Sequence, residues 1–193
     1  MFPFAAAPIG RVAGAAFTTW NPADKDASVT LSNNNKTAAS PGSAQLVRAV
    51  KDIPSKVYIE FLAVARNGAS TCYGLATGSE SMSTTLGVGG SSIGYQANGA
   101  ILSGSADQGA GAYSSFFTND RIGMAFDLNT RKLWFSLNGV FPSGNPSTGS
   151  GGIVFGAAGL IYPCVSPNGT VTANFGDAPF TYPVPTGFTG LAA

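Results

Sequence analysis

The sequence predicts an all-β protein whose antiparallel strands pack as a sandwich or barrel. Almost no window of about ten or more residues places apolar side chains at helical spacing without a Gly or Pro. Glycine occurs 26 times and proline 12 times in 193 residues, so the chain is densely punctuated. Several of its four Asn-Gly dipeptides fall between runs rich in β-branched and aromatic residues. Asn-Gly favours hairpin turns because it tolerates the positive φ angles that such turns need.

Strands are predicted where β-rich residues alternate between two faces. In chain order they cover residues 28–31, 45–50, 56–65, 72–76, 92–95, 99–102, 120–128, 132–137, 160–165 and 170–175. The third reads KVYIEFLAVA and places Val57, Ile59 and Phe61 on one face, with large side chains on the other. Apolar patterns on both faces suit strands that lie between two packed sheets.

Three pairs of these strands are expected to form hairpins. The pairs are 92–95 with 99–102, 120–128 with 132–137, and 160–165 with 170–175. Four turn-rich stretches are predicted as loops, namely 32–44, 103–118, 141–152 and 178–190. Neither a fixed-period repeat nor a long linker divides the chain, so residues 20–193 are predicted to form one domain.

Charge and composition exclude several classes of function. Charged residues make up 10% of the chain, ten basic and nine acidic, and Arg131-Lys132 is its one adjacent basic pair. No nucleic-acid partner is expected, because phosphate binding needs clustered Lys and Arg. The chain has no histidine, which removes the commonest general base and zinc ligand. No apolar run reaches the ~18 residues of a membrane span, and no basic region precedes the apolar N-terminus as in a secretory signal.

The acidic residues do not form a recognisable catalytic or metal-binding pattern. The two glutamates, Glu60 and Glu80, lie in a strand and in a Gly/Ser-rich connection, whereas glycosidases need two carboxyl groups across one cleft. Asp24 and Asp26 could ligate calcium, but two aspartates at this spacing more often form a turn. We therefore expect no catalytic residue, no metal and no cofactor.

The two cysteines are far apart in the sequence. Cys72 and Cys164 are expected to be small buried apolar side chains, and a disulfide between them stays open at this stage.

Motifs of the second half follow one family pattern in order. They read RIGMAFDL, LWFSLNGV, LIYPCVS and VTANFG and begin at residues 121, 133, 160 and 171. They resemble the SPRY domain patterns G-x-A-x-D, L-x-F-x-x-N-G, L-Y-P-x-V-S and V-x-x-N-F-G. With weaker matches upstream, the resemblance runs from about Trp20 to Leu191. It implies a bent antiparallel β-sandwich of the concanavalin-like jelly-roll type.

The residues that carry the resemblance have roles in the fold. Trp134 and Phe135 alternate, so each face of their strand receives one large aromatic ring. Asp127 ends a strand and is expected to accept hydrogen bonds from N–H groups of the following turn. Asn174 is expected to satisfy nearby backbone groups.

The resemblance also implies that partners bind loops at one end of the sandwich, which agrees with the general placement of function on loops. The candidate binding residues are Tyr113, Phe116 and Phe117 in the loop 103–118, with Tyr95 and Gln96 beside a predicted turn. Large rings among small residues resemble the anchors of interaction surfaces. The alternative, that Phe116 and Phe117 begin the next strand and belong to the core, stays open.

The first 19 residues lie outside the resemblance and are predicted to form an N-terminal arm or an extra edge strand. Phe2, Phe4 and Ile9 would be unfavourable in water on a free arm. They are expected to pack on the domain or to dock on a neighbouring subunit.

The low charge, the dominance of small residues and the stand-alone length are similar to SPRY proteins of bacteria and bacteriophages. We therefore expect a non-enzymatic binding or structural module, a phage virion component that decorates the capsid or belongs to the tail or fibre. Its partners would be other virion proteins in an oligomeric assembly, put together in the host cytoplasm. The alternative is a host-attachment module that binds a cell-surface protein or glycan through its loops.

Overall fold

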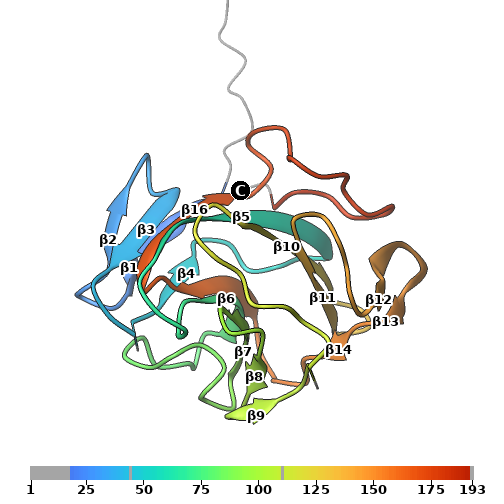
Figure 1. Ribbon diagram of the computed structural model, residues 1–193, viewed down its shortest axis with the longest axis horizontal. Helices are drawn as coiled ribbons and strands as arrows, with labels where there is room; N and C mark the ends of the chain where they lie inside the picture. Colours follow the sequence, from blue (N-terminus) through green and yellow to red (C-terminus); the bar gives the residue numbers. More distant parts are fainter. Residues whose placement is uncertain (1–17, 44, 110, 192–193) are drawn as a thin grey trace, which may run out of the picture.

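The computed structural model describes residues 18–43, 45–109 and 111–191, and Figure 1 shows two large sheets packed face to face. The described residues contain no α-helix and one short 3₁₀ turn, Pro146–Thr148. All pairs of named strands are antiparallel. The all-β sandwich predicted from the sequence is therefore confirmed. Phe2, Phe4 and Ile9 of the predicted arm lie outside the described residues.

Each large sheet has seven strands. The first contains, in spatial order, β1 (Trp20–Lys25), β4 (Val47–Ala49), β15 (Ile161–Ser166), β6 (Cys72–Thr77), β7 (Ser92–Gln96), β8 (Ile101–Ser103) and β9 (Ala106–Asp107). The second contains β14 (Ile153–Val154), β11 (Lys132–Leu137), β10 (Arg121–Asp127), β5 (Lys56–Arg66), β16 (Gly169–Asn174), β3 (Thr37–Ser40) and β2 (Thr30–Ser32). A separate ribbon pairs β12 (Gly144–Asn145) with β13 (Ser150–Gly151). No described helix is long and apolar enough to span a membrane.

Two of the three predicted hairpins are confirmed, and the third is wrong. Strand β7 pairs with β8, and β10 pairs with β11. Strands β15 and β16 instead belong to different sheets, so the turn between them carries the chain across the sandwich. Asn168 holds this crossing, because its carbonyl accepts hydrogen bonds from the Asn67 N–H and the Thr71 hydroxyl, both at 2.9 Å. Val165 and Val171 can then both be buried in the same core.

The sequence also misses strands that are short and polar. Strand β3 lies inside the predicted loop 32–44, where it pairs with β2 and β16. The β2–β3 turn contains Asn33, Asn34 and Asn35, all with positive φ, and a run of three polar asparagines conceals the hairpin. Strand β1 is missed as well, because its sequence WNPADK has no clear alternation.

The aromatic residues divide between the two faces of the second sheet as expected. Phe135 is buried in the central core between the sheets, whereas Trp134 lies in a second cluster with Tyr58 and Phe188. The expected backbone contacts are present, since the Asn129 N–H donates to Asp127 at 3.0 Å and the Gly176 N–H donates to Asn174 at 2.9 Å.

Both cysteines are buried and unpaired in the described structure. Cys72 and Cys164 lie in a small cluster with Leu46, Ala76 and Leu86. Burial raises the pKa of both thiols, so they remain protonated at neutral pH. The expectation of two small buried apolar side chains is confirmed.

Candidate functional site

Seven connections gather at one end of the sandwich, here called the loop end. They follow β1, β3, β5, β7, β9, β11 and β15. The strand register places Leu62 opposite Arg121, Ile122 opposite Leu137, and Cys72 opposite Gln96, so these strand ends lie together. Because antiparallel neighbours alternate in direction, every second connection reaches the same end.

Four of the five predicted binding residues are buried, so their side chains offer a partner little or no surface. Tyr95 and Phe116 have no exposed surface, Tyr113 is 7% exposed and Gln96 is 9% exposed. The Tyr95 ring contacts Tyr113, Phe116 and Phe135 at centroid distances of 5.4, 5.2 and 5.5 Å. The connection before β10 folds back between the two sheets, and its rings of Tyr113 and Phe116 pack in the central core.

Hydrogen bonds hold this connection in place. The Phe116 N–H donates to the carbonyl of Ala97 at 3.1 Å, and the Tyr95 hydroxyl donates to the carbonyl of Ser114. Burial raises the pKa of the Tyr95 phenol, which therefore stays protonated as a donor. Tyr95, Tyr113 and Phe116 thus act as a framework that fixes the loop above them.

Phe117 is the predicted binding residue that does lie at the surface, with 60% of its side chain exposed. Its N–H donates to a carboxylate oxygen of Asp120 at 2.7 Å. The guanidinium of Arg66 lies 5.3 Å from the centre of its ring, within cation–π range. Neighbouring side chains of an extended chain point to opposite sides, so burial of Phe116 turns Phe117 outward. The alternative that Phe116 and Phe117 both belong to the core is therefore right for Phe116 and wrong for Phe117.

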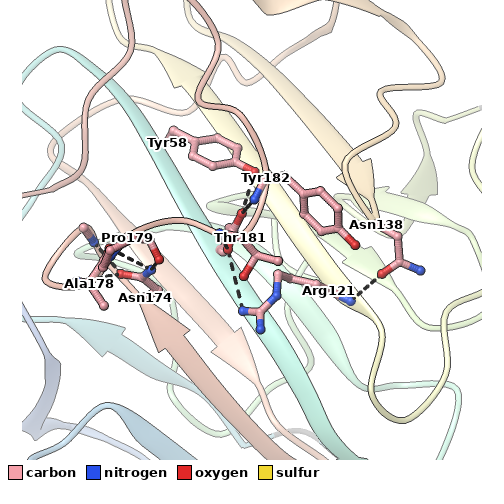
Figure 2. A network of polar contacts seen from close by, with 10 residues as sticks. Tyr58, Arg121, Asn138, Asn174, Ala178, Pro179, Thr181 and Tyr182 are labelled. Carbon is pink, nitrogen blue, oxygen red and sulfur yellow. Dashed lines mark hydrogen bonds and ion pairs between the residues drawn. The ribbon is translucent and has the colours of Figure 1, made fainter.

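A polar clamp joins the connection before β10 to the turn after β11. Asn138 donates from its side-chain amide to Asp120 at 2.8 Å. It also accepts from the Arg121 N–H at 2.9 Å (Figure 2). Val140, in the same turn, is 68% exposed. A hollow of about 190 Å³ beside it is lined by Tyr95, Ser114, Leu137, Val140 and Pro142. We call the side chains of Val64, Arg66, Phe117 and Val140 the loop-end surface.

The outer face of the second sheet is crossed by the C-terminal segment between Phe175 and Leu191, two residues that are themselves buried in the central core. In Figure 1 this segment, drawn in red, lies on the outer side of β5 and β10. Its Thr189 carbonyl accepts a hydrogen bond from the Tyr58 N–H at 2.8 Å. Phe180 and Phe188 pack there against Tyr58 and Trp134.

Glu60 fastens the segment to the sheet. Its carboxylate is completely buried and accepts the N–H groups of Thr181 and Tyr182, both at 2.9 Å, and the Tyr58 hydroxyl at 3.2 Å. Figure 2 shows these partners beside Arg121, whose guanidinium lies 3.6 Å from the same carboxylate. Burial, and then the charge of Glu60, raises the pKa of the Tyr58 phenol, so it remains a donor. Sequence reasoning missed this role because the segment lies far from Glu60 in the chain.

The crossing segment leaves a groove on each side. A polar groove of about 310 Å³ is lined by Lys36, Arg121, Thr172, Asn174, Asp177 and Thr181, among other residues. It adjoins the loop end, because Arg121 directly follows Asp120. An apolar groove of about 460 Å³ lies between Phe141 and Pro146 on one side and Val184 on the other, with no charged residue in its lining.

The other acidic candidates are engaged in internal contacts. Asp24 accepts two hydrogen bonds from the buried Arg48, at 2.7 and 2.8 Å. Asp26 accepts from the Ser28 N–H at 2.8 Å and from the Ser83 hydroxyl at 2.7 Å. Within the described ranges, no three His, Cys, Asp or Glu side chains are grouped so that they could hold a metal ion.

Comparison with known proteins shows the fold. No family model matches the chain. Among solved structures, the SPRY domain of human HERC1 has a TM-score of 0.63 and 16% identity over 80% of this chain and 96% of that domain. The PSpry domain of TRIM65 has a TM-score of 0.59 and 18% identity over 82% of this chain and 92% of that one. The SPRY-like fold implied by the sequence motifs is therefore confirmed.

One curated protein matches at the sequence level. It is the "Dual specificity protein kinase splA" of Dictyostelium discoideum, 28% identical over 169 residues. The match covers 82% of this chain, which spans only 7% of the kinase's length. The bacterial or bacteriophage type of SPRY protein stays a prediction.

Proposed function

We propose that this SPRY-like chain is a non-enzymatic protein-binding module whose partner contacts the loop-end surface. The observation that carries the proposal is Phe117, a large aromatic ring that is 60% exposed and held rigidly. Its backbone is fixed by Asp120, its ring lies under Arg66, and the adjacent Phe116 is buried in the core. An ordered exposed aromatic ring loses little conformational entropy on binding, and such rings dominate interface energies.

The rest of the surface supports recognition rather than catalysis. Val64 and Val140 add exposed apolar area, at 39% and 68% exposure. The carboxylates of Asp24 and Glu60, which sequence reasoning weighed for chemistry, hold the fold together instead. The neighbours in fold are SPRY domains, whose likeness supports a module rather than an enzyme.

Phe117→Ala should weaken binding at least about tenfold while leaving the fold intact, because the ring contributes little to the core. The test is to pan a random dodecapeptide display library on the wild-type chain and measure the affinity of the selected peptides for each variant. Leu160→Ala is the matched control: Leu160 is also 60% exposed, but it lies in the β14–β15 connection. Equal affinity of Phe117→Ala and wild type would contradict the proposal.

We also propose that the natural partner is a subunit of a bacteriophage virion, in the capsid or the tail. Low charge and the abundance of small residues support this narrower assignment. The protein should then co-sediment with purified particles, and deletion of residues 1–17 should reduce that association if the arm docks on a neighbour. Recovery only in the soluble fraction would contradict it, and adhesion to host cells without particle association would favour the attachment role.

A further inference from the structure

We propose that the polar groove beside Glu60 is a subsite for a carboxylate on the partner and that Arg121 binds it. The inference rests on the proposed function, because the partner supplies this group as an aspartate or glutamate side chain. It adds a charged contact to the aromatic contact of Phe117.

The carboxylate of Glu60 has several hydrogen-bond donors, whereas the nearby guanidinium of Arg121 has no hydrogen-bond acceptor within the described part of the chain. Glu60 already accepts three hydrogen bonds, from the Thr181 N–H, the Tyr182 N–H and the Tyr58 hydroxyl. Arg121 approaches the same carboxylate only at 3.6 Å, beyond hydrogen-bond distance. No other acceptor among the described residues binds its guanidinium, which has five N–H donors and is part of a side chain that is 25% exposed.

Three other polar side chains of the groove, those of Lys36, Thr172 and Asn174, have hydrogen-bond partners. Lys36 forms an ion pair with Asp177 at 2.7 Å and donates to the Thr18 carbonyl at 2.9 Å. The side-chain amide of Asn174 donates to the backbone behind it, and the Thr172 hydroxyl bonds to that of Thr37 at 2.8 Å. Arg121 therefore supplies the spare charged donors of this groove.

The chemistry of the site favours a carboxylate. A planar guanidinium binds a carboxylate through two parallel hydrogen bonds. The backbone of Arg121, which carries the guanidinium, is fixed by its N–H contact to Asn138 at 2.9 Å. Asp177 lines the groove, and the buried carboxylate of Glu60 lies 3.6 Å from Arg121. These two carboxylates would repel a doubly charged phosphate more strongly than a singly charged carboxylate.

The position of the groove fits a single partner segment. Arg121 follows Asp120, which orders Phe117, and Leu62 lies opposite Arg121 in the neighbouring strand. An extended acidic segment on this face would place an apolar side chain on Phe117 and a carboxylate in the groove.

The test uses peptides selected from a dodecapeptide display library on the wild-type chain. We expect an acidic residue at a fixed position, and its change from Asp to Asn should weaken binding about tenfold. Arg121→Gln should cause a similar loss for the acidic peptide and little further loss for its Asn form, as required of a coupled pair. The affinity of Arg121→Lys for the acidic peptide should lie between those of wild type and Arg121→Gln, because lysine keeps the charge but lacks the planar guanidinium.

Lys51→Gln, which removes an exposed positive charge from the β4–β5 connection, is the matched control and should bind as wild type. Thermal unfolding of each variant checks that the fold is kept. Selected peptides without an acidic preference, or equal affinity for Arg121→Lys, Arg121→Gln and wild type, would overturn the inference. If those peptides still need Phe117, the proposed function stands; a library that yields no binder contradicts both.

Discussion

Glu60→Ala should lower the free energy of unfolding by about 3–5 kcal/mol, because it removes one partner of a buried ionic network. The loss leaves the N–H groups of Thr181 and Tyr182 without an acceptor and Arg121 without its counter-charge. A donor that loses its partner costs about 1–3 kcal/mol where water cannot replace that partner, and these two N–H groups are partly buried. Urea unfolding, followed by the fluorescence of the two tryptophans, measures the effect.

Asp177→Asn provides the control for this prediction. Asp177 also forms an ion pair with a basic side chain, but 29% of it is exposed. A pair of this kind contributes about 1 kcal/mol or less. The Glu60 variant should also be cleaved faster by proteases within residues 177–188, because the carboxylate fastens that segment to the sheet. If Glu60→Ala and Asp177→Asn lose the same free energy of unfolding, the burial of Glu60 does not increase its contribution to stability.

Gly74→Ala should destabilise the protein by about 3 kcal/mol or more, because the added methyl group would clash with the backbone of the neighbouring strand β7. A Cβ at Gly74 would lie 2.1 Å from the carbonyl oxygen of Ile93 and 2.8 Å from the Cα of Gly94. Both atoms belong to the backbone of β7, so the clash is relieved only if β6 and β7 move apart. The register places Gly74 directly opposite Gly94, and this facing pair permits the close approach.

Gly90→Ala is the matched control, because a Cβ at Gly90 meets no atom within 4 Å. Its effect should stay within about 0.5 kcal/mol, as for other surface substitutions. Thermal and urea unfolding of the two variants give the comparison. Similar stability of both would show that the sheet accommodates a side chain at Gly74, contrary to the geometry.

The sequence alone determined the features that depend on neighbouring residues. Alternation identified β5, β10 and β11, and the turn residues identified the β10–β11 hairpin, which the structure confirms with pairing from Ile122 to Asp127. The hydrogen bond from Asn129 to Asp127 was likewise predictable, because it joins residues two apart. Period and turn chemistry are local properties, so they can be read from a short stretch of chain.

Only the tertiary structure decided which residues the surface presents. The same loop buries Tyr113 and Phe116 and exposes Phe117, because rings from distant strands fill the space beneath it. Strands β15 and β16 separate into two sheets although their turn resembles that of a hairpin. Glu60 binds N–H groups 121 and 122 residues further along the chain. Such contacts depend on how two sheets and a crossing segment pack in space, and no local pattern of residues contains that information.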